Sequence, residues 1–206
     1  MPLSFVRPER LEQIASELLT KFHPSLDLPV PIEQIVEFDF GLDIVPVENL
    51  YKEYGIEGWL ANDMTTIHVD AYQYSNWLFK YRFTLSHELA HLLLHADLYS
   101  GKAFGTVEEW LKFQEGLDTA LVDRYEWQAR NLAGRILVPA EPLVRLAQQA
   151  LDERRADLPP DVVPGLLWQY LAIPLAPKFE VSDDVVAFRL SGDGIGKRLR
   201  LVGPMN

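Results

Sequence analysis

Two histidines and a glutamate at helical spacing are the residues whose types and positions most directly indicate chemistry. His87 and His91 stand four residues apart in residues 82–95, a Leu-rich stretch without Gly or Pro that is predicted to form one helix. Side chains at this spacing lie one turn apart on one face, so both imidazoles can reach a single tetrahedral metal ion. Glu88 lies beside them and completes the H-E-x-x-H pattern of zinc metalloproteases.

The alternative interpretation of this stretch is a core helix whose histidines are satisfied by ordinary hydrogen bonds. Five leucines leave little polar surface around the helix axis: Leu85, Leu89, Leu92, Leu93 and Leu94. A helix that is apolar on most sides is buried, and a buried carboxylate is costly unless something pairs with it. A metal ion and its water would pair with both histidines and with Glu88, so the sequence favours a metal site.

His95 is one of two residues that could complete such a site, because a catalytic zinc ion needs three protein ligands. It continues the four-residue series, but it lies roughly 12 Å along the helix axis from His87 at 1.5 Å per residue. This distance is too long for the two side chains to share an ion comfortably. We therefore expect His95 to support the ligands through hydrogen bonds or to cap the helix.

Glu126 is the better candidate for the third ligand. It shares a helical face with Ala129 and Ala133, and such small residues let a second helix approach closely. A carboxylate on a buried face needs a partner. The alternative is an exposed ion pair with Arg130 one turn further on, which would contribute only a few tenths of a kcal/mol.

Composition narrows the class of protein. The chain has 206 residues, 48% of them apolar, and a net charge of −11, so binding to nucleic acid or to an anionic membrane is disfavoured. Cysteine is absent, and any metal must therefore be held by histidines and carboxylates. Neither a signal peptide nor a membrane-spanning run is evident. We expect a cytoplasmic protein with a core over residues 1–139 and a helical extension over 140–206 packed on the same domain.

The spacing of apolar residues predicts an α+β fold in which a helix and a small sheet precede the histidine helix. A first helix begins at Pro8 and ends before Pro24, and a shorter one follows Pro31. Strands are expected over 42–47, with Pro46 at a sheet edge, and over 56–61 and 64–70, which flank the hairpin turn at 62–63. We expect the three strands to form an antiparallel sheet and Asn76 to cap the histidine helix.

Helices dominate the remainder of the sequence. Thr106 and Glu109 form a capping box that opens one helix. Further helices are expected over 123–138, 142–155, 166–171 and 183–190, a Leu-Pro-Pro linker over 158–160, and a glycine-containing loop after 191.

Two segments resemble the ImmA/IrrE family of metallo-endopeptidases. Residues 82–95 read RFTLSHELAHLLLH, similar to the family's RFTLAHELGHLLLH, and residues 126–139 read EWQARNLAGRILVP, similar to its ExxANxFAxxLLMP. Shorter stretches at 28–35, 58–60 and 179–190 extend the resemblance over about residues 10–192. The departures are Ser86 for Ala, Ala90 for Gly and Arg130 for Asn.

The resemblance implies a zincin-like, gluzincin-like fold and a zinc endopeptidase in which His87, His91 and Glu126 hold Zn²⁺. It also implies that Glu88 is the general base, which accepts the proton of the attacking water and delivers it to the leaving amine. A second oxyanion donor is expected, with Tyr125, Arg130 and His95 as candidates. The implied substrate is a helix-turn-helix repressor, cut once to release transcription.

Two other functions compete with this interpretation. The chain could sequester a repressor without cutting it, but a purely structural metal site has no need of Glu88. Residues 181–190 also loosely resemble part of a helix-turn-helix, with basic residues nearby. Acidic residues offset that charge, and in a chain of net charge −11 we expect no direct contact with nucleic acid.

Overall fold

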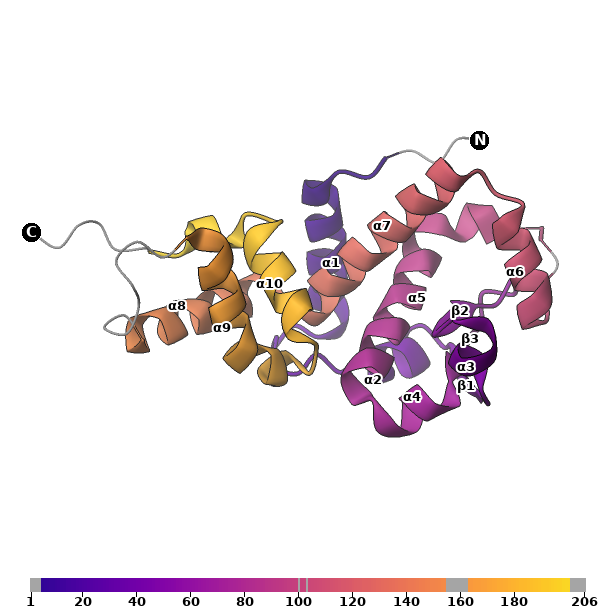
Figure 1. Cartoon of the computed structure of the whole chain (residues 1–206), viewed down its shortest axis with the longest axis horizontal. Coiled ribbons are helices and arrows are strands. Elements are labelled where there is room, and N and C mark those ends of the chain that lie inside the picture. Colours follow the sequence, from indigo (N-terminus) through magenta and orange to yellow (C-terminus); the bar gives the residue numbers. More distant parts are fainter. Residues whose placement is uncertain (1–4, 100, 103, 155–162, 201–206) are drawn as a thin grey trace, which may run out of the picture.

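Helix α5 (Leu78–Tyr99) is the element against which the others are arranged. In the computed structural model, which describes residues 5–99, 101–102, 104–154 and 163–200, α5 contacts the sheet on one side and α7 (Thr119–Leu137) on the other. Figure 1 shows the sheet at one end of the molecule, α8, α9 and α10 at the other, and α1, α5 and α7 between them. The predicted α+β class is confirmed.

The helices and strands have the following bounds. The first half contains α1 (Pro8–Phe22), α2 (Ile32–Gln34), the π-helical turn η1 (Ile35–Asp39), β1 (Asp43–Val47), α3 (Leu50–Tyr54), β2 (Gly58–Leu60), β3 (Thr66–Asp70) and α4 (Ala71–Asn76). After α5 come α6 (Val107–Glu115), α7, α8 (Ala140–Glu153), α9 (Pro164–Phe179), α10 (Asp183–Ser191) and the 3-10 turn η3 (Ile195–Arg198). None of the described helices is both long enough and apolar enough to span a bilayer.

The sheet is mixed, with β3 in the centre. β2 pairs with β3 antiparallel, as expected for a hairpin, but β1 pairs with β3 parallel. The expectation of an antiparallel sheet is therefore correct for one pairing and wrong for the other. The tight turn at residues 62–63 forces the hairpin, whereas α3 and β2 lie between β1 and β3 and supply the crossover that a parallel pair requires. β1 lies at an edge, where Pro46 was predicted to place it.

Gly58 of β2 lies too close to β3 and α5 to carry a side chain. A Cβ atom added at Gly58 would lie 2.6 Å from the carbonyl oxygen of His68 and 2.7 Å from Cγ2 of Thr84. Both distances are shorter than real Cβ contacts, so any other residue would force the strand, the helix or both to shift. This approach holds the Gly58–Leu60 strand against the face of α5 that carries the H-E-x-x-H pattern.

Helix α7 packs against α5 along small residues. Ala129 and Ala133 are fully buried, and the Ser86 hydroxyl of α5 donates a hydrogen bond of 3.2 Å to the carbonyl oxygen of Ala133. Small side chains at this spacing let the two helix backbones come close together. The predicted close approach of a second helix at this face is confirmed.

A buried charge network joins α7, α10 and α1. The Arg189 guanidinium binds both carboxylate oxygens of Glu12, at 2.8 and 3.1 Å, and also binds Asp193. Arg135 of α7 binds the same Asp193 carboxylate. Since each charge meets an opposite charge, the network fixes α10 against the end of α7 despite its burial.

Several boundaries differ from those predicted. Asn76 ends α4 and donates to the Tyr72 carbonyl, so it does not cap α5, and Asp70 instead caps α4 by accepting from the Gln73 N–H. α9 continues to Phe179, well beyond the predicted end, and η3 replaces part of the predicted loop. The predicted linker at 158–160 lies outside the described residues. The division into a core over 1–139 and an extension over 140–206 stays a prediction.

Replacing Gly58 with Ala should destabilise the fold, because the new methyl group would collide with a backbone oxygen and with α5. Overpacking of this kind costs about 1–3 kcal/mol. Urea unfolding would measure the change. The matched control is Gly165→Ala, where the added methyl meets nothing within 4 Å and a helix position should gain up to about 1 kcal/mol. Equal stability of the two variants would show that β2 does not need this approach.

Candidate metal centre

His87, His91 and Glu126 converge at the interface of α5 and α7. The two histidine Nε2 atoms lie 3.0 Å apart, and the Glu126 carboxylate lies 3.3 Å from His87 Nε2 and 3.5 Å from His91 Nε2. One ligand atom from each residue lies within 4.8 Å of the other two, so the three side chains could hold one metal ion. The structure thus brings together the three residues that the sequence singled out.

Glu126 takes part in both of the interactions that the sequence allowed. Its carboxylate lies 3.6 Å from the Arg130 guanidinium, but Arg130 is 68% exposed, and an exposed pair contributes little. Burial by itself would raise the pKa of the Glu126 carboxyl group, yet the contacts of its carboxylate with the imidazoles of His87 and His91 hold that pKa well below its usual value. The carboxylate therefore stays negative beside the two imidazoles, as a cation site requires.

Glu88 lies beside this cluster without joining it. Its side chain is 5% exposed, and Oε2 accepts a hydrogen bond of 2.8 Å from the backbone N–H of Leu60. In the β2–β3 pair, Glu57 and Ala61 bond to β3, so the polar groups of Leu60 point to the other side, towards α5. Burial raises the pKa of the Glu88 carboxyl group to about 7, which suits a group that must both accept and release a proton near neutral pH.

His95 supports His91 through a chain of hydrogen bonds that also fixes which nitrogen carries the proton. His91 Nδ1 lies 3.0 Å from His95 Nδ1, and His95 Nε2 lies 3.4 Å from the Gln128 amide oxygen. Because burial lowers the pKa of His91 to about 3 and that of His95 to about 4, each ring carries one proton.

The amide oxygen of Gln128 can only accept, and this decides the direction of the chain. The proton of His95 must lie on Nε2, so its Nδ1 accepts from His91 Nδ1–H. His91 is left with an unprotonated Nε2 facing His87 and Glu126, which is the form in which an imidazole binds metal. The expectation that His95 supports the ligands rather than joining them agrees with these contacts.

A cavity of about 370 Å³ opens onto these residues and is lined in part by Gly58, Tyr99, Trp110 and Arg130. Of the expected oxyanion donors, only Arg130 lines it. Tyr125 is buried and donates its hydroxyl hydrogen to the Gln114 side chain, and His95 is buried behind His91. These two side chains are thus occupied elsewhere.

Sequence reasoning missed Leu60 and Gln128 as members of the site. Leu60 contributes a backbone N–H, which no residue type signals. Gln128 lies two residues after Glu126, and its position on the buried face of α7 becomes informative only when α5 is seen to lie against it.

Known proteins resemble this chain in sequence and in fold. Residues 71–191, more than half of the chain, match the family model Peptidase_M78, described as the IrrE N-terminal-like domain. No curated protein matches the chain. A solved structure of a Mycobacterium tuberculosis transcriptional regulator is similar, with a TM-score of 0.55 and 19% sequence identity over 89% of this chain. The likeness covers 46% of that protein, so this chain spans less than half of its length and shares its fold.

Replacing Glu126 tests whether the carboxylate is a metal ligand or only a partner of Arg130. Glu126→Gln keeps the shape and removes the charge. With zinc as the probe, the metal affinity should therefore fall by more than about 100-fold, since loss of a group that only supports a ligand costs about 10–100-fold. Arg130→Ala should leave zinc bound. Zinc content after dialysis against a mild chelator measures both, and a full equivalent of tightly held zinc in Glu126→Ala would remove Glu126 from the site.

Replacing His95 with Leu should weaken zinc binding about 10–100-fold without removing a ligand, because His91 Nδ1–H loses its acceptor. Competition with a chromophoric chelator would measure the affinity. His23→Gln serves as the control. His23 lies at the end of α1, where its ring contacts the backbone oxygen of Asp27 and not the cluster. Unchanged affinity in His95→Leu would show that the ring of His91 is held by other contacts.

Proposed function

The chain belongs to the IrrE N-terminal-like domain family, Peptidase_M78, and on that premise we propose that it is a zinc-dependent endopeptidase. The observation that carries the proposal is the convergence of His87, His91 and Glu126 within 4.8 Å of one another, with the carboxylate of Glu88 beside them. Family membership supports a peptidase, and the donor atoms support the metal.

Zinc is the proposed metal because of the donor set. Two imidazoles and one carboxylate are the protein ligands of catalytic zinc in a major class of metallopeptidases, and three ligands leave a fourth position for water or substrate. When bound, zinc would supply Lewis acidity that polarises the scissile carbonyl and activates water. The absence of cysteine from the chain fits this set and disfavours a thiolate site.

Glu88 is the proposed general base. The Leu60 N–H holds its Oε2 in place, so Oε1 is the oxygen that exchanges a proton. In the proposed reaction Oε1 takes the proton of the attacking water and later passes it to the leaving amine, which breaks the peptide bond and restores the carboxylate. The same N–H keeps the carboxylate of Glu88 from turning to join Glu126 and the histidines.

We propose that the substrate is a helix-turn-helix transcriptional repressor. The resemblance to the ImmA/IrrE family supports this choice, and the structural neighbour bears the name of a transcriptional regulator. A net charge of −11 favours encounter with a basic protein. DNA-binding proteins commonly carry such a basic surface.

Glu88→Gln should keep zinc and stop cleavage, since it leaves all three ligand side chains in place. Loss of general base catalysis should slow the reaction by about 10²–10⁴. The assay co-expresses the chain with any helix-turn-helix protein that a neighbouring gene encodes, and it detects fragments by mass spectrometry. Glu48→Gln, at an exposed position outside the cavity, is the matched control.

Two outcomes would contradict the proposal. If Glu88→Gln relieved repression in cells as well as the wild type, without fragments, the protein would act by sequestering its partner. If the wild type bound less than one equivalent of zinc after reconstitution, the metal centre would be wrong.

A further inference from the structure

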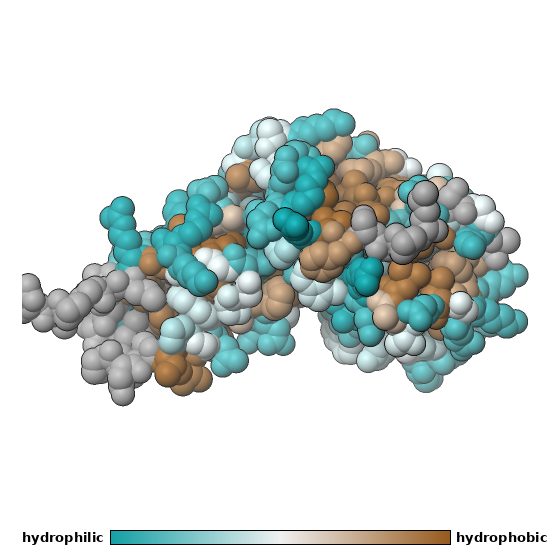
Figure 2. Space-filling view, turned by 90° about the horizontal axis from the view of Figure 1, so that it is seen from above, coloured by the Kyte–Doolittle hydropathy of each residue, from teal (hydrophilic) through white to brown (hydrophobic). Residues whose placement is uncertain are grey.

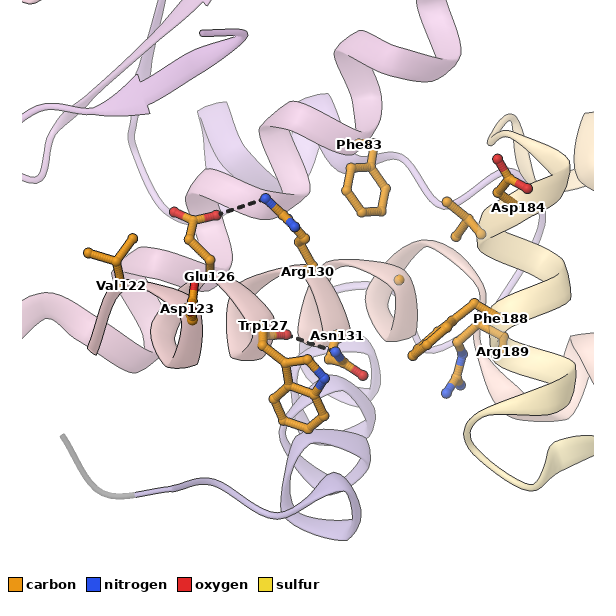
Figure 3. A pocket seen from close by; sticks show the side chains of 12 residues that line it. Phe83, Val122, Asp123, Glu126, Trp127, Arg130, Asn131, Asp184, Phe188 and Arg189 are labelled. Carbon is orange, nitrogen blue, oxygen red and sulfur yellow. Dashed lines mark hydrogen bonds and ion pairs between the residues drawn. The ribbon is translucent and has the colours of Figure 1, made fainter. Parts of the chain in front are cut away.

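A second cavity lies beside the candidate metal centre and differs from it in character. It has a volume of about 640 Å³ and is walled by α5, α7 and α10, within the range of about 300–1,000 Å³ typical of ligand sites. In Figure 3, Phe83 projects from α5 towards α7, and Phe188 closes the space from the side of α10. Figure 2 shows the outline of the molecule indented between the part that holds α10 and the part that holds the sheet.

The two cavities adjoin each other. Phe83, Glu126 and Arg130 line both of them. Glu126 belongs to the candidate metal cluster itself, and Phe83 and Arg130 each lie four residues from a member of it, about 6 Å along the helix axis. An extended chain advances about 3.3 Å per residue, and a polypeptide with its reacting bond at the metal centre would place a side chain one or two residues away in this cavity.

The second cavity is lined by charged residues and by several large apolar side chains. Phe83, Trp127 and Val185 are half-buried, and Phe188 is 47% exposed, facing the same space. Aromatic surface left open in this way favours the burial of an apolar group. The indole ring of Trp127 already packs against an apolar group of the chain itself, because the ring of Phe5 stacks on it with a centroid distance of 5.5 Å.

We propose that this cavity receives a large apolar side chain of the polypeptide substrate, such as Leu, Met or Phe, one or two residues from the bond that is cut. This inference rests on the proposed function and adds which kind of substrate side chain the second cavity binds. The metal centre then performs the chemistry, and α10 contributes to the choice of the bond.

Variants of the cavity wall provide the test. Phe188→Ala removes an exposed wall residue, and Val185→Phe fills the space from the same helix. Phe38→Ala is the matched control, because Phe38 is 80% exposed on η1 and lies outside the second cavity. Thermal unfolding and zinc content should be unchanged in Phe188→Ala, which separates loss of the wall from loss of the fold.

The first measurement needs neither metal nor cleavage. N-acetyl-leucinamide and N-acetyl-alaninamide are titrated separately into the full-length protein, and the indole N–H resonance of Trp127 is followed by NMR. The leucine compound should bind at least about tenfold more tightly, as expected for added methyl groups in an apolar pocket. Phe188→Ala and Val185→Phe should remove this difference, and Phe38→Ala should retain it.

The second measurement maps the bonds that the zinc-loaded protein cuts in a mixture of proteome-derived peptides. Leu, Met and Phe should be enriched about 10–200-fold over Ala one or two residues from the cut, and Phe188→Ala should reduce that enrichment. Equal binding of the two amides, or cleavage without an apolar preference, overturns the cavity assignment. Preferential binding of the leucine compound without any peptide or repressor cleavage supports the cavity and refutes the proposed peptidase.

Discussion

The packing of α5 against α7 is the contact on which the rest of the structure depends. It buries polar groups that would be costly alone, namely two imidazoles from one helix and a carboxylate from the other, and it brings them within 3.5 Å of one another. Their mutual attraction offsets that cost. The pKa of Glu126 is lowered despite its burial, so the contacts with the two imidazoles outweigh the loss of solvation of the carboxylate. The small residues Ala129 and Ala133 make the approach possible, so the position of Glu126 follows from the same sequence pattern that lets the helices meet.

Two further contacts fix the surroundings of this helix pair. Gly58 lets β2 lie against α5, and the Leu60 N–H then holds Glu88. At the other end, Arg189 and Asp193 fasten α10 to α7 and α1. The sheet therefore positions the carboxylate of Glu88 by contact with α5, whereas α10 positions the wall of the apolar cavity by contact with α7.

The convergence of His87, His91 and Glu126 could be anticipated because helical periodicity is local information. Periodicity alone places His87 and His91 on one face and turns Glu126 inward. The parallel pairing of β1 was missed because nothing in residues 43–47 specifies a partner far along the chain. α9 was predicted to end near residue 171, yet it continues past Pro174 and Pro177 with Leu175, Ala176 and Phe179 buried. Burial of those side chains outweighs the cost of proline inside a helix, about 3 kcal/mol or more for each, and such tertiary burial is not readable from local pattern.

The arrangement of the two cavities also indicates how chemistry and recognition can vary separately in this fold. His87, His91 and Glu126 line the smaller, polar cavity. The same two helices, α5 and α7, contribute Phe83 and Trp127 to the larger cavity beside it. Its remaining wall comes from α10, which carries none of His87, Glu88, His91 or Glu126. Substitution of the exposed Phe188 on α10 can therefore reshape the apolar cavity while the cluster stays intact, because Arg189 also holds the helix in place through Glu12 and Asp193. The charge network thus separates the position of α10 from the exposed side chains that face the apolar cavity.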